Sequence, residues 1–189
     1  MSKKRVGFAL CGSFCTFREV IDQLAKLARN YDVTPIMSYN AANLDTRFGR
    51  ALDFIEELER VCGRPVMKTI QEAEPIGPKN MFDLLVVAPC TGNTLAKLAL
   101  SITDTPVTMA VKSHLRGEKP VLLAISTNDA LSGSAKNFGA LLNTKHYYFV
   151  PMRQDNPNQK PNSLVARFDL LGDAMEAALE RKQLEPIFR

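Results

Sequence analysis

Small hydroxyl and amide side chains follow four predicted strands, at the points where the strands end. They are Gly12 and Ser13 after the first strand, Ser38 after the second, Pro89, Cys90, Thr91, Gly92, Asn93 and Thr94 after a central strand, and Ser126, Thr127 and Asn128 after the next. Several of these turns open into predicted helices, whose free N–H groups and partial positive charge suit a phosphate. Any one of these residues is also an ordinary helix cap. Four such turns together favour a nucleotide-like ligand.

The spacing of the glycines excludes two kinds of nucleotide site. The first strand is followed by C-G-S-F-C-T, which is not the G-x-G-x-x-G pattern of a dinucleotide fold. The sequence also lacks the G-x-x-x-x-G-K-[ST] pattern of a phosphate-binding loop. A compact mononucleotide is therefore the expected ligand.

The four cysteines and two histidines do not have the spacing of a metal site. Cys11 and Cys15 are separated by three residues, whereas Cys62, Cys90 and the two histidines are distant singles. This matches neither a zinc pattern nor a C-x-x-C redox pair. We expect reduced, mostly buried thiols and no metal.

Composition indicates one ordinary globular domain. The 189 residues are 46% hydrophobic and 23% charged, and the net charge of +4 comes from 24 basic and 20 acidic residues scattered along the chain. Scattered charges do not favour nucleic acid as a partner. The opening M-S-K-K-R precedes an apolar run that Gly12 and Ser13 interrupt, so we expect no export signal. No stretch has the length of a membrane span, and the cytoplasm is the expected location.

Strand and helix patterns alternate along the chain. Apolar runs predict strands at 5–11, 33–37, 82–88, 121–125 and 147–150, and apolar positions three or four apart predict helices at 14–29, 52–61, 94–101, 107–115 and 131–142. We place Ser13 as the N-cap of the first helix. This alternation predicts an α/β fold, a doubly wound parallel sheet of the flavodoxin or Rossmann type in three α/β/α layers. The whole of 1–189 is one domain, and ligands of such sheets bind outside the carboxyl ends of the strands.

Two segments near the end of the chain differ from this pattern. Residues 151–162 hold three prolines and almost nothing apolar, which predicts a mobile arm or lid. Residues 163–182 are predicted to form a final amphipathic helix, capped by Ser163.

The turns also resemble those of a known family. The segment A-P-C-T-G-N-T-L-A-K-L-A (88–99), the Gly12-Ser13 pair and S-T-N-D-A-L (126–131) are similar to the flavin-containing cysteine decarboxylase superfamily, which includes the prenyl-flavin synthases. Its P-A-S-A-N-T turn, which supports the isoalloxazine ring and ribityl phosphate, falls on 89–94. Its P-x-M-N-x-x-M loop falls on 125–131, where only Asn128 is retained. The resemblance implies FMN as the cofactor.

This sequence departs from the family at its catalytic positions. The cysteine decarboxylases have a histidine after the second strand, where the segment 45–49 offers only Arg47. We therefore do not expect decarboxylation of a peptidyl cysteine. Asn128 and Cys90 are the catalytic candidates, although Cys90 also fits a small buried hydrophobe. Arg47 and Arg153 are candidates for binding a dicarboxylate substrate.

Over nearly the whole chain, the resemblance is to a branch of the superfamily from spore-forming bacteria. It implies a complex with a nicotinamide-dependent (NADP or NAD), dehydrogenase-like partner that oxidises dihydrodipicolinate to dipicolinate in the mother cell. It also implies a homo-oligomer, a trimer or a dodecamer. A stand-alone flavin-dependent decarboxylase or prenyl-flavin synthase is one alternative, and a flavin-fold protein without catalysis is another.

Overall fold

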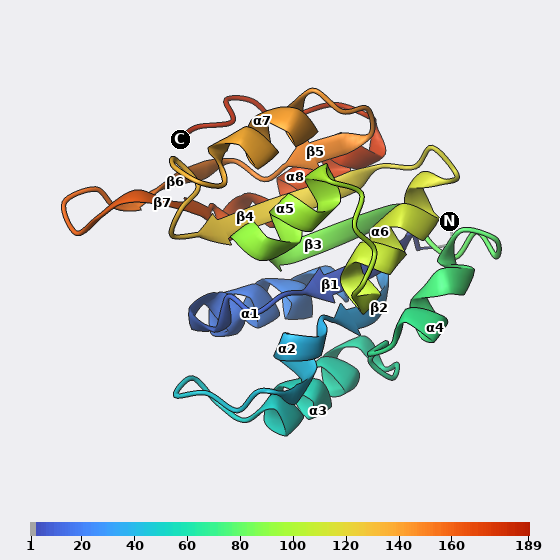
Figure 1. Ribbon diagram of the computed structural model, residues 1–189. Helices are drawn as coiled ribbons and strands as arrows, with labels where there is room; N and C mark the ends of the chain where they lie inside the picture. The colour runs from blue at the N-terminus through green and yellow to red at the C-terminus, as the bar shows by residue number, and fades with distance from the viewer. Residues whose placement is uncertain (1–2) are drawn as a thin grey trace.

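A computed structural model describes residues 3–189, which form one sheet of seven strands (Figure 1). Five strands run parallel and lie side by side in the order β2 (Asp32–Met37), β1 (Arg5–Leu10), β3 (Leu84–Cys90), β4 (Val121–Thr127) and β5 (Tyr147–Phe149). This 2-1-3-4-5 order is that of flavodoxin-like doubly wound sheets. The predicted fold class is therefore confirmed.

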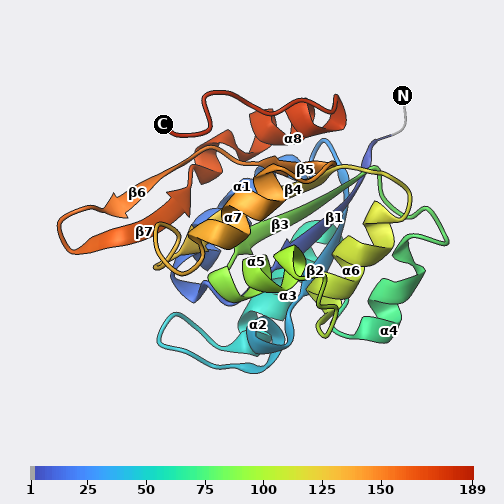
Figure 2. The same ribbon diagram turned by 45° about the horizontal axis from the view of Figure 1, so that its top comes forward.

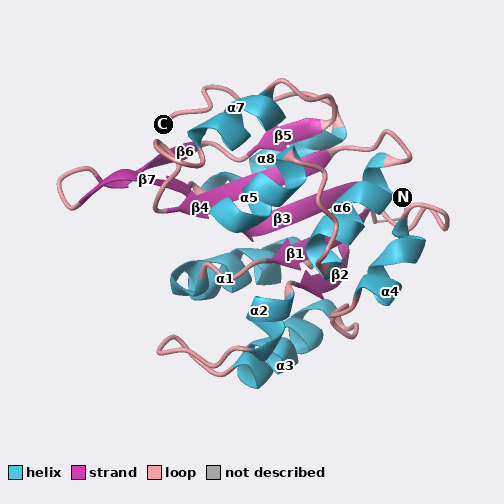
Figure 3. Cartoon of the chain, viewed as in Figure 1, coloured by secondary structure: helices cyan, strands magenta, loops and turns pink. Residues whose placement is uncertain are grey.

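Helices cover both faces of the sheet and give the molecule three layers (Figures 1 and 3). On one face lie α1 (Phe17–Leu27), α3 (Ala51–Cys62) and α8 (Leu171–Leu179). On the other face lie α4 (Ile70–Ala73), α5 (Gly92–Ala99), α6 (Pro106–Leu115) and α7 (Ala135–Leu142). The short helix α2 (Tyr39–Asn43) follows β2, and single 3-10 turns lie at η1 (Phe14–Thr16), η2 (Glu74–Ile76) and η3 (Phe168–Leu170).

The central strands are apolar throughout because both of their faces are covered. All seven residues of β3 are buried. Leu84 and Val86 pack on the side of α1 and α8, whereas Leu85 and Val87 pack on the side of α5 and α6. Burying each of these side chains contributes about 1.5–3 kcal/mol before conformational entropy is counted. The long apolar run that predicted this strand therefore reflects its central position.

The order of the sheet reverses between β1 and β3, and a crevice is expected outside the carboxyl ends of these strands. Main-chain hydrogen bonds hold the strand ends together at this edge. The Cys11 N–H donates to the Pro89 carbonyl at 3.2 Å, and the Ser38 N–H donates to the Leu10 carbonyl at 3.0 Å. The turns that follow β1, β2 and β3 therefore start from one rigid edge.

The last two strands form a hairpin that the sequence did not predict. β6 (Met152–Asn156) pairs antiparallel with β7 (Lys160–Ala166), and β7 in turn pairs with the end of β4. The hairpin projects beyond the rest of the molecule in both views (Figures 1 and 2). The mobile arm or lid predicted over 151–162, without secondary structure, is thus a hairpin. Pro151 precedes β6 and Pro157 lies in the turn, whereas Pro161 lies near the start of β7, and prolines are tolerated at such positions at the edge of a sheet.

Two further predictions about helices are corrected by the structure. The helix predicted over 163–182 covers only Leu171–Leu179, since 163–166 continue strand β7. Ser13 makes no capping hydrogen bond, and the one-turn η1 separates it from the start of α1 at Phe17. In both cases a polar side chain that resembles a cap does not begin an α-helix. No helix within residues 3–189 is long and apolar enough to cross a membrane.

Candidate functional site

Two adjoining cavities lie at the carboxyl edge of the parallel strands. The first has a volume of about 410 Å³ and the second about 700 Å³. Gly12, Phe14 and Thr91 line both, so the cavities meet where the turns after β1 and β3 face each other. This is the crevice that the strand order predicts.

The first cavity is surrounded by the starts of three helices. Ser38, Thr91 and Thr105 are the N-caps of α2, α5 and α6, and each accepts a hydrogen bond from the main chain of its own helix. The remaining wall comes from Gly12, Phe14, Tyr39, Asn40, Asn93, Thr94, Lys97 and Asp104. Because free N–H groups and the positive end of the helix dipole meet at each start, this cavity favours an anion.

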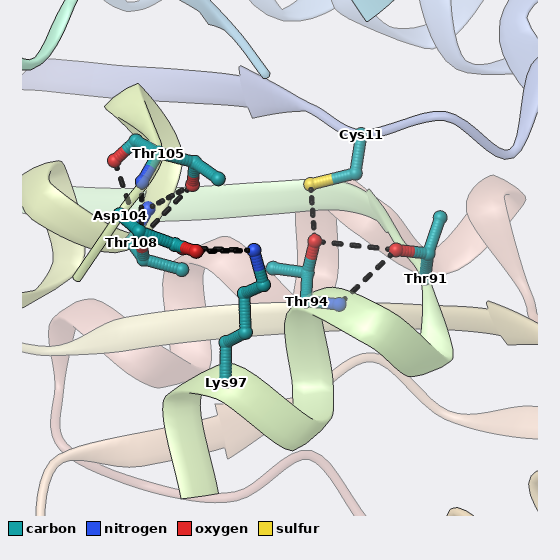
Figure 4. A network of polar contacts seen from close by, with 7 residues as sticks. All are labelled: Cys11, Thr91, Thr94, Lys97, Asp104, Thr105 and Thr108. Carbon is teal, nitrogen blue, oxygen red and sulfur yellow. Dashed lines mark hydrogen bonds and ion pairs between the residues drawn. The ribbon is translucent and has the colours of Figure 1, made fainter. Parts of the chain in front are cut away.

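The side chains between α5 and α6 are fixed by mutual hydrogen bonds (Figure 4). The Lys97 ammonium lies 2.8 Å from both carboxylate oxygens of Asp104. At the start of α6, the Thr108 N–H donates to Thr105 Oγ1 at 3.1 Å, and the Thr105 N–H donates to Thr108 Oγ1 at 3.0 Å. These contacts hold the wall of the first cavity in one arrangement, and the pairing with Lys97 lowers the pKa of Asp104.

A second set of hydrogen bonds joins α5 to β1 (Figure 4). The Thr91 hydroxyl donates to Thr94 Oγ1 at 3.2 Å, and the Thr94 hydroxyl donates to Cys11 Sγ at 3.3 Å. Burial raises the pKa of the Cys11 thiol to about 11, so the sulfur is an uncharged acceptor. Cys11 is therefore a structural residue, whose sulfur holds the first turn of α5 against the end of β1.

The second cavity has walls from a loop and the hairpin. The loop after α2 contributes Arg47 and Phe48, and the hairpin contributes Arg153, Asp155 and Lys160. Lys160 is paired with Asp155 at 2.5 Å, and the Arg47 guanidinium lies 4.9 Å from the Phe48 ring centroid. Arg47 and Arg153 form no ion pair with any residue of 3–189. This cavity therefore offers two guanidinium groups to an anion.

Glu19 of α1 also lies in the wall of the second cavity. Burial and the nearby Asp169 raise the pKa of Glu19, whereas Arg153 opposes the rise. This coupling indicates that the hairpin and the amino end of α1 share one electrostatic environment.

One wall of the second cavity joins the turn after β1 to the end of β4. Ser13 Oγ and Ser126 Oγ lie 3.1 Å apart and form a hydrogen bond. Ser126 and Thr127, the last residues of β4, are themselves paired with Val165 and Leu164 of β7, so the hairpin holds this strand end in place. The two serines, which are far apart in the sequence, thus form one structural unit.

Most of the predicted site residues line one of the two cavities. Gly12 and Thr91 line both, Ser38, Asn93 and Thr94 line the first, and Ser13, Ser126, Thr127, Asn128, Arg47 and Arg153 line the second. Pro89, Cys90 and Gly92 line neither. Pro89 and Cys90 are the last residues of β3 rather than part of a turn. Burial raises the pKa of the Cys90 thiol well above its usual value, and this catalytic candidate is a core residue.

The predicted site residues leave out six wall residues of the first cavity: Phe14, Tyr39, Asn40, Lys97, Asp104 and Thr105. Tyr39 and Asn40 belong to α2, a helix of five residues that is too short to leave a periodic pattern. Lys97 could have been found, because it lies three positions after Thr94 on the predicted helix 94–101 and hence on the same face.

A third hollow lies at the opposite edge of the sheet. It measures about 790 Å³ and is lined by Lys3, Lys4, Arg5, Asp32 and Asp83 among others. Arg5 is paired with Asp83 at 3.2 Å, and Asp32 with Arg64 at 2.8 Å. This hollow lies at the amino ends of the strands, away from the helix starts, and both of its carboxylates are already paired.

Comparison with known proteins gives a consistent result. The family model described as Flavoprotein matches residues 1–157. The B subunit of dipicolinate synthase from Bacillus subtilis (strain 168) is 44% identical over 185 residues, which cover 97% of this chain and 92% of that protein. The crystal structure of the B subunit of dipicolinate synthase from Bacillus halodurans C has a TM-score of 0.90 and 43% identity, and the match covers 98% of this chain and 96% of that one.

A more distant structure shows the same fold. DmrB of Burkholderia xenovorans in complex with FMN, described as a cubic protein cage for redox transfer, has a TM-score of 0.69 at 20% identity, over 95% of this chain and 97% of that chain. The chain belongs to the Flavoprotein family. Within that family, it belongs to the group represented by the B subunit of dipicolinate synthase.

Proposed function

We propose that this chain is an FMN-binding subunit of a dipicolinate synthase, which works with a nicotinamide-dependent, dehydrogenase-like partner in the cytoplasm of a sporulating cell. The observation that carries the proposal is the pair of cavities that meet at Gly12 and Thr91, one built for a phosphate and one bearing two guanidinium groups. The name of the Bacillus subtilis relative and its 44% sequence identity to this chain support the assignment.

The first cavity fits the phosphate of FMN. Ser38 Oγ accepts a hydrogen bond from the Ala41 N–H at 3.3 Å, which leaves the Ser38 proton free to donate to a phosphate oxygen. The starts of α5 and α6 face the same space. Gly12 keeps the passage between the cavities open, because a Cβ there would lie 3.3 Å from the Phe14 ring and 3.8 Å from Asn40 Cβ.

The second cavity fits the isoalloxazine ring together with a dicarboxylate substrate. Arg47 and Arg153 would each bind one carboxylate of the substrate through paired N–H donors. Asn128 lies in the same wall and offers an amide to the ring or the substrate. FMN, when bound, supplies the acceptor for the hydride that leaves the dihydropyridine ring. The task of this chain is then to bind and orient the two molecules.

A homo-oligomer is part of the proposal. Exposed apolar side chains lie on α2, on α3 and on the connections that follow α2 and α5: Tyr39, Leu44, Phe48, Leu52, Leu100 and Ile102. Leu100 retains 69% of its surface and Leu52 retains 55%. Such residues are typical of a surface that a second copy covers, and a trimer or dodecamer is the expected assembly. Leu100→Glu should shift the sedimentation coefficient to that of a smaller species.

The alternative of a cysteine decarboxylase is not favoured. Neither His114 nor His146 lines either cavity. His114 is buried at the far end of α6 and bonds to the Pro120 carbonyl at 3.0 Å. The imidazole that this chemistry uses in the family therefore has no counterpart at the site.

Titration of the purified chain with FMN, followed by flavin fluorescence and visible absorbance, tests the proposal. We expect stoichiometric binding, with dipicolinate formation when the dehydrogenase-like partner and its nicotinamide cofactor are added. FMN binding without any effect on the rate of the mixture would instead support a chain that keeps the flavin fold without catalysis. If the chain binds no FMN, the proposal is wrong.

A further inference from the structure

Three polar side chains converge on Gly92, the first residue of α5. A Cβ on Gly92 would lie 2.7 Å from Thr127 Oγ1 and 2.8 Å from both Asp129 Oδ1 and Ser134 Oγ. These separations are shorter than ordinary contacts of a Cβ, so any other residue at this position would have to displace the three side chains. The absence of a side chain brings the Asp129 carboxylate to the amino end of α5.

Both oxygens of the Asp129 carboxylate are held in place. The Thr127 hydroxyl donates to Oδ1 at 2.6 Å, and the Ser134 hydroxyl donates to Oδ2 at 2.8 Å. The N–H groups of Ser132 and Ser134 each donate to the Asp129 carbonyl at 3.0 Å. The hydrogen bond from Thr127 contributes most to lowering the pKa of Asp129, so the group is ionised at neutral pH.

This arrangement decides what the Thr127 hydroxyl can do. A threonine hydroxyl has one proton to donate and two lone pairs. Because the proton of Thr127 is directed to Asp129, the oxygen can only accept a further hydrogen bond. Thr127 lies in the wall of the second cavity, where such an oxygen selects a ligand group with an N–H.

We propose that Asp129 is a positioning residue of the flavin site, which fixes Thr127 as an acceptor for an N–H of the ring and places a fixed negative charge beside it. This inference rests on the proposed function. A fixed negative charge near the ring disfavours the anionic reduced flavin and lowers its reduction potential.

The test compares Asp129→Asn with Asp173→Asn, which removes one charge from the exposed surface of α8, away from both cavities. An asparagine can still accept from Thr127, so the first variant changes charge more than shape. We expect it to raise the affinity for reduced FMN relative to oxidised FMN by about two- to five-fold, the range for a charge at a helix end. The measured midpoint potential of bound FMN then becomes more positive, whereas Asp173→Asn leaves it unchanged.

A second variant covers the case in which Asp129→Asn does not fold. Thr127→Val keeps the Asp129 charge and removes the acceptor, and we expect it to weaken FMN binding by about three- to ten-fold, as for the loss of one hydrogen bond. Equal potentials in the two aspartate variants, or unchanged FMN affinity in Thr127→Val, would overturn the inference while leaving the proposed function intact. If the wild-type chain binds no FMN, both the proposed function and the inference about Asp129 are wrong.

Discussion

The two cavities of this protein are formed by different kinds of structural element. The first is formed by the starts of three helices, and each of their caps is fixed by a hydrogen bond to its own helix. The second takes its charged wall from a loop and from a hairpin that projects beyond the rest of the molecule. The comparison teaches that the sheet and its helix starts supply a general anion site, whereas peripheral elements supply the chemistry that distinguishes one ligand from another.

The largest effect should come from Gly12, where the two cavities meet. Gly12→Val places a branched side chain against the Phe14 ring and Asn40, in the space that both cavities share. We expect FMN affinity to fall by more than about 100-fold, since two cavities can no longer hold one ligand. Gly139→Val is the matched control, because a Cβ there has nothing within 4 Å. Normal FMN affinity in a folded Gly12→Val protein would mean that the cavities do not act together.

The guanidinium groups of Arg47 and Arg153 should affect only the ligand that binds in the second cavity beside them, which is the dicarboxylate substrate. Replacing Arg47 or Arg153 by alanine should raise the KM for the dicarboxylate by about 10-fold to 100-fold, the range for a lost hydrogen bond to a charged group. FMN affinity should stay within about two-fold, because we assign the two guanidinium groups to the carboxylates of the substrate and not to FMN. Arg116→Ala, at the far end of α6, controls for net charge. A loss of FMN affinity in the same variants would show that substrate binding and FMN binding depend on the same residues.

Gly92→Ala tests the contact between α5 and the turn after β4. Alanine usually stabilises the interior of a helix relative to glycine, but here its Cβ would meet three oxygens at 2.7–2.8 Å. We expect the free energy of unfolding to decrease by about 1–3 kcal/mol in urea. Gly139→Ala in α7 should instead increase it. Stabilisation in both variants would mean that the turn moves aside without cost.

The smallest effect should come from Ser38, whose hydroxyl we assign to the phosphate. Ser38→Ala should weaken FMN binding by about two- to ten-fold, as for one hydrogen bond. Binding of riboflavin, which has no phosphate, should not change beyond the effect of losing the cap of α2. Equal losses for FMN and riboflavin would place the phosphate elsewhere.

The sequence predicted the location of the first cavity, but not the elements that form the outer wall of the second. Strand ends in a parallel sheet lie at one edge, so the positions of Gly12, Ser38 and Thr91 followed from the order of the elements. The wall of the second cavity depends on where the hairpin folds back, and no local pattern in 151–162 revealed that β7 would pair with β4. Such a long-range pairing is decided by tertiary contacts rather than by local propensity.

The same limit explains the three predicted residues that line neither cavity. The family turn placed Pro89, Cys90 and Gly92 beside the flavin, but a sequence pattern does not tell which side of a turn faces the ligand. Gly92 faces Thr127 and Asp129, and Cys90 faces the core. Packing requires small residues at these positions. A ligand site would require the same residue types, so the sequence alone does not distinguish the two.

Strand β4 has different neighbours along its length. Its first residues pair with β3 and β5 inside the sheet, and its last two, Ser126 and Thr127, pair with the hairpin. Hydrogen-bonded and non-hydrogen-bonded pairs alternate along an antiparallel ladder, so one of these two residues directs its N–H at β7. That amide proton exchanges with solvent when the hairpin separates from β4, without any opening of the parallel sheet. Its exchange rate would measure how often the outer wall of the second cavity detaches, and hence how readily a substrate as large as the cavity could enter or leave.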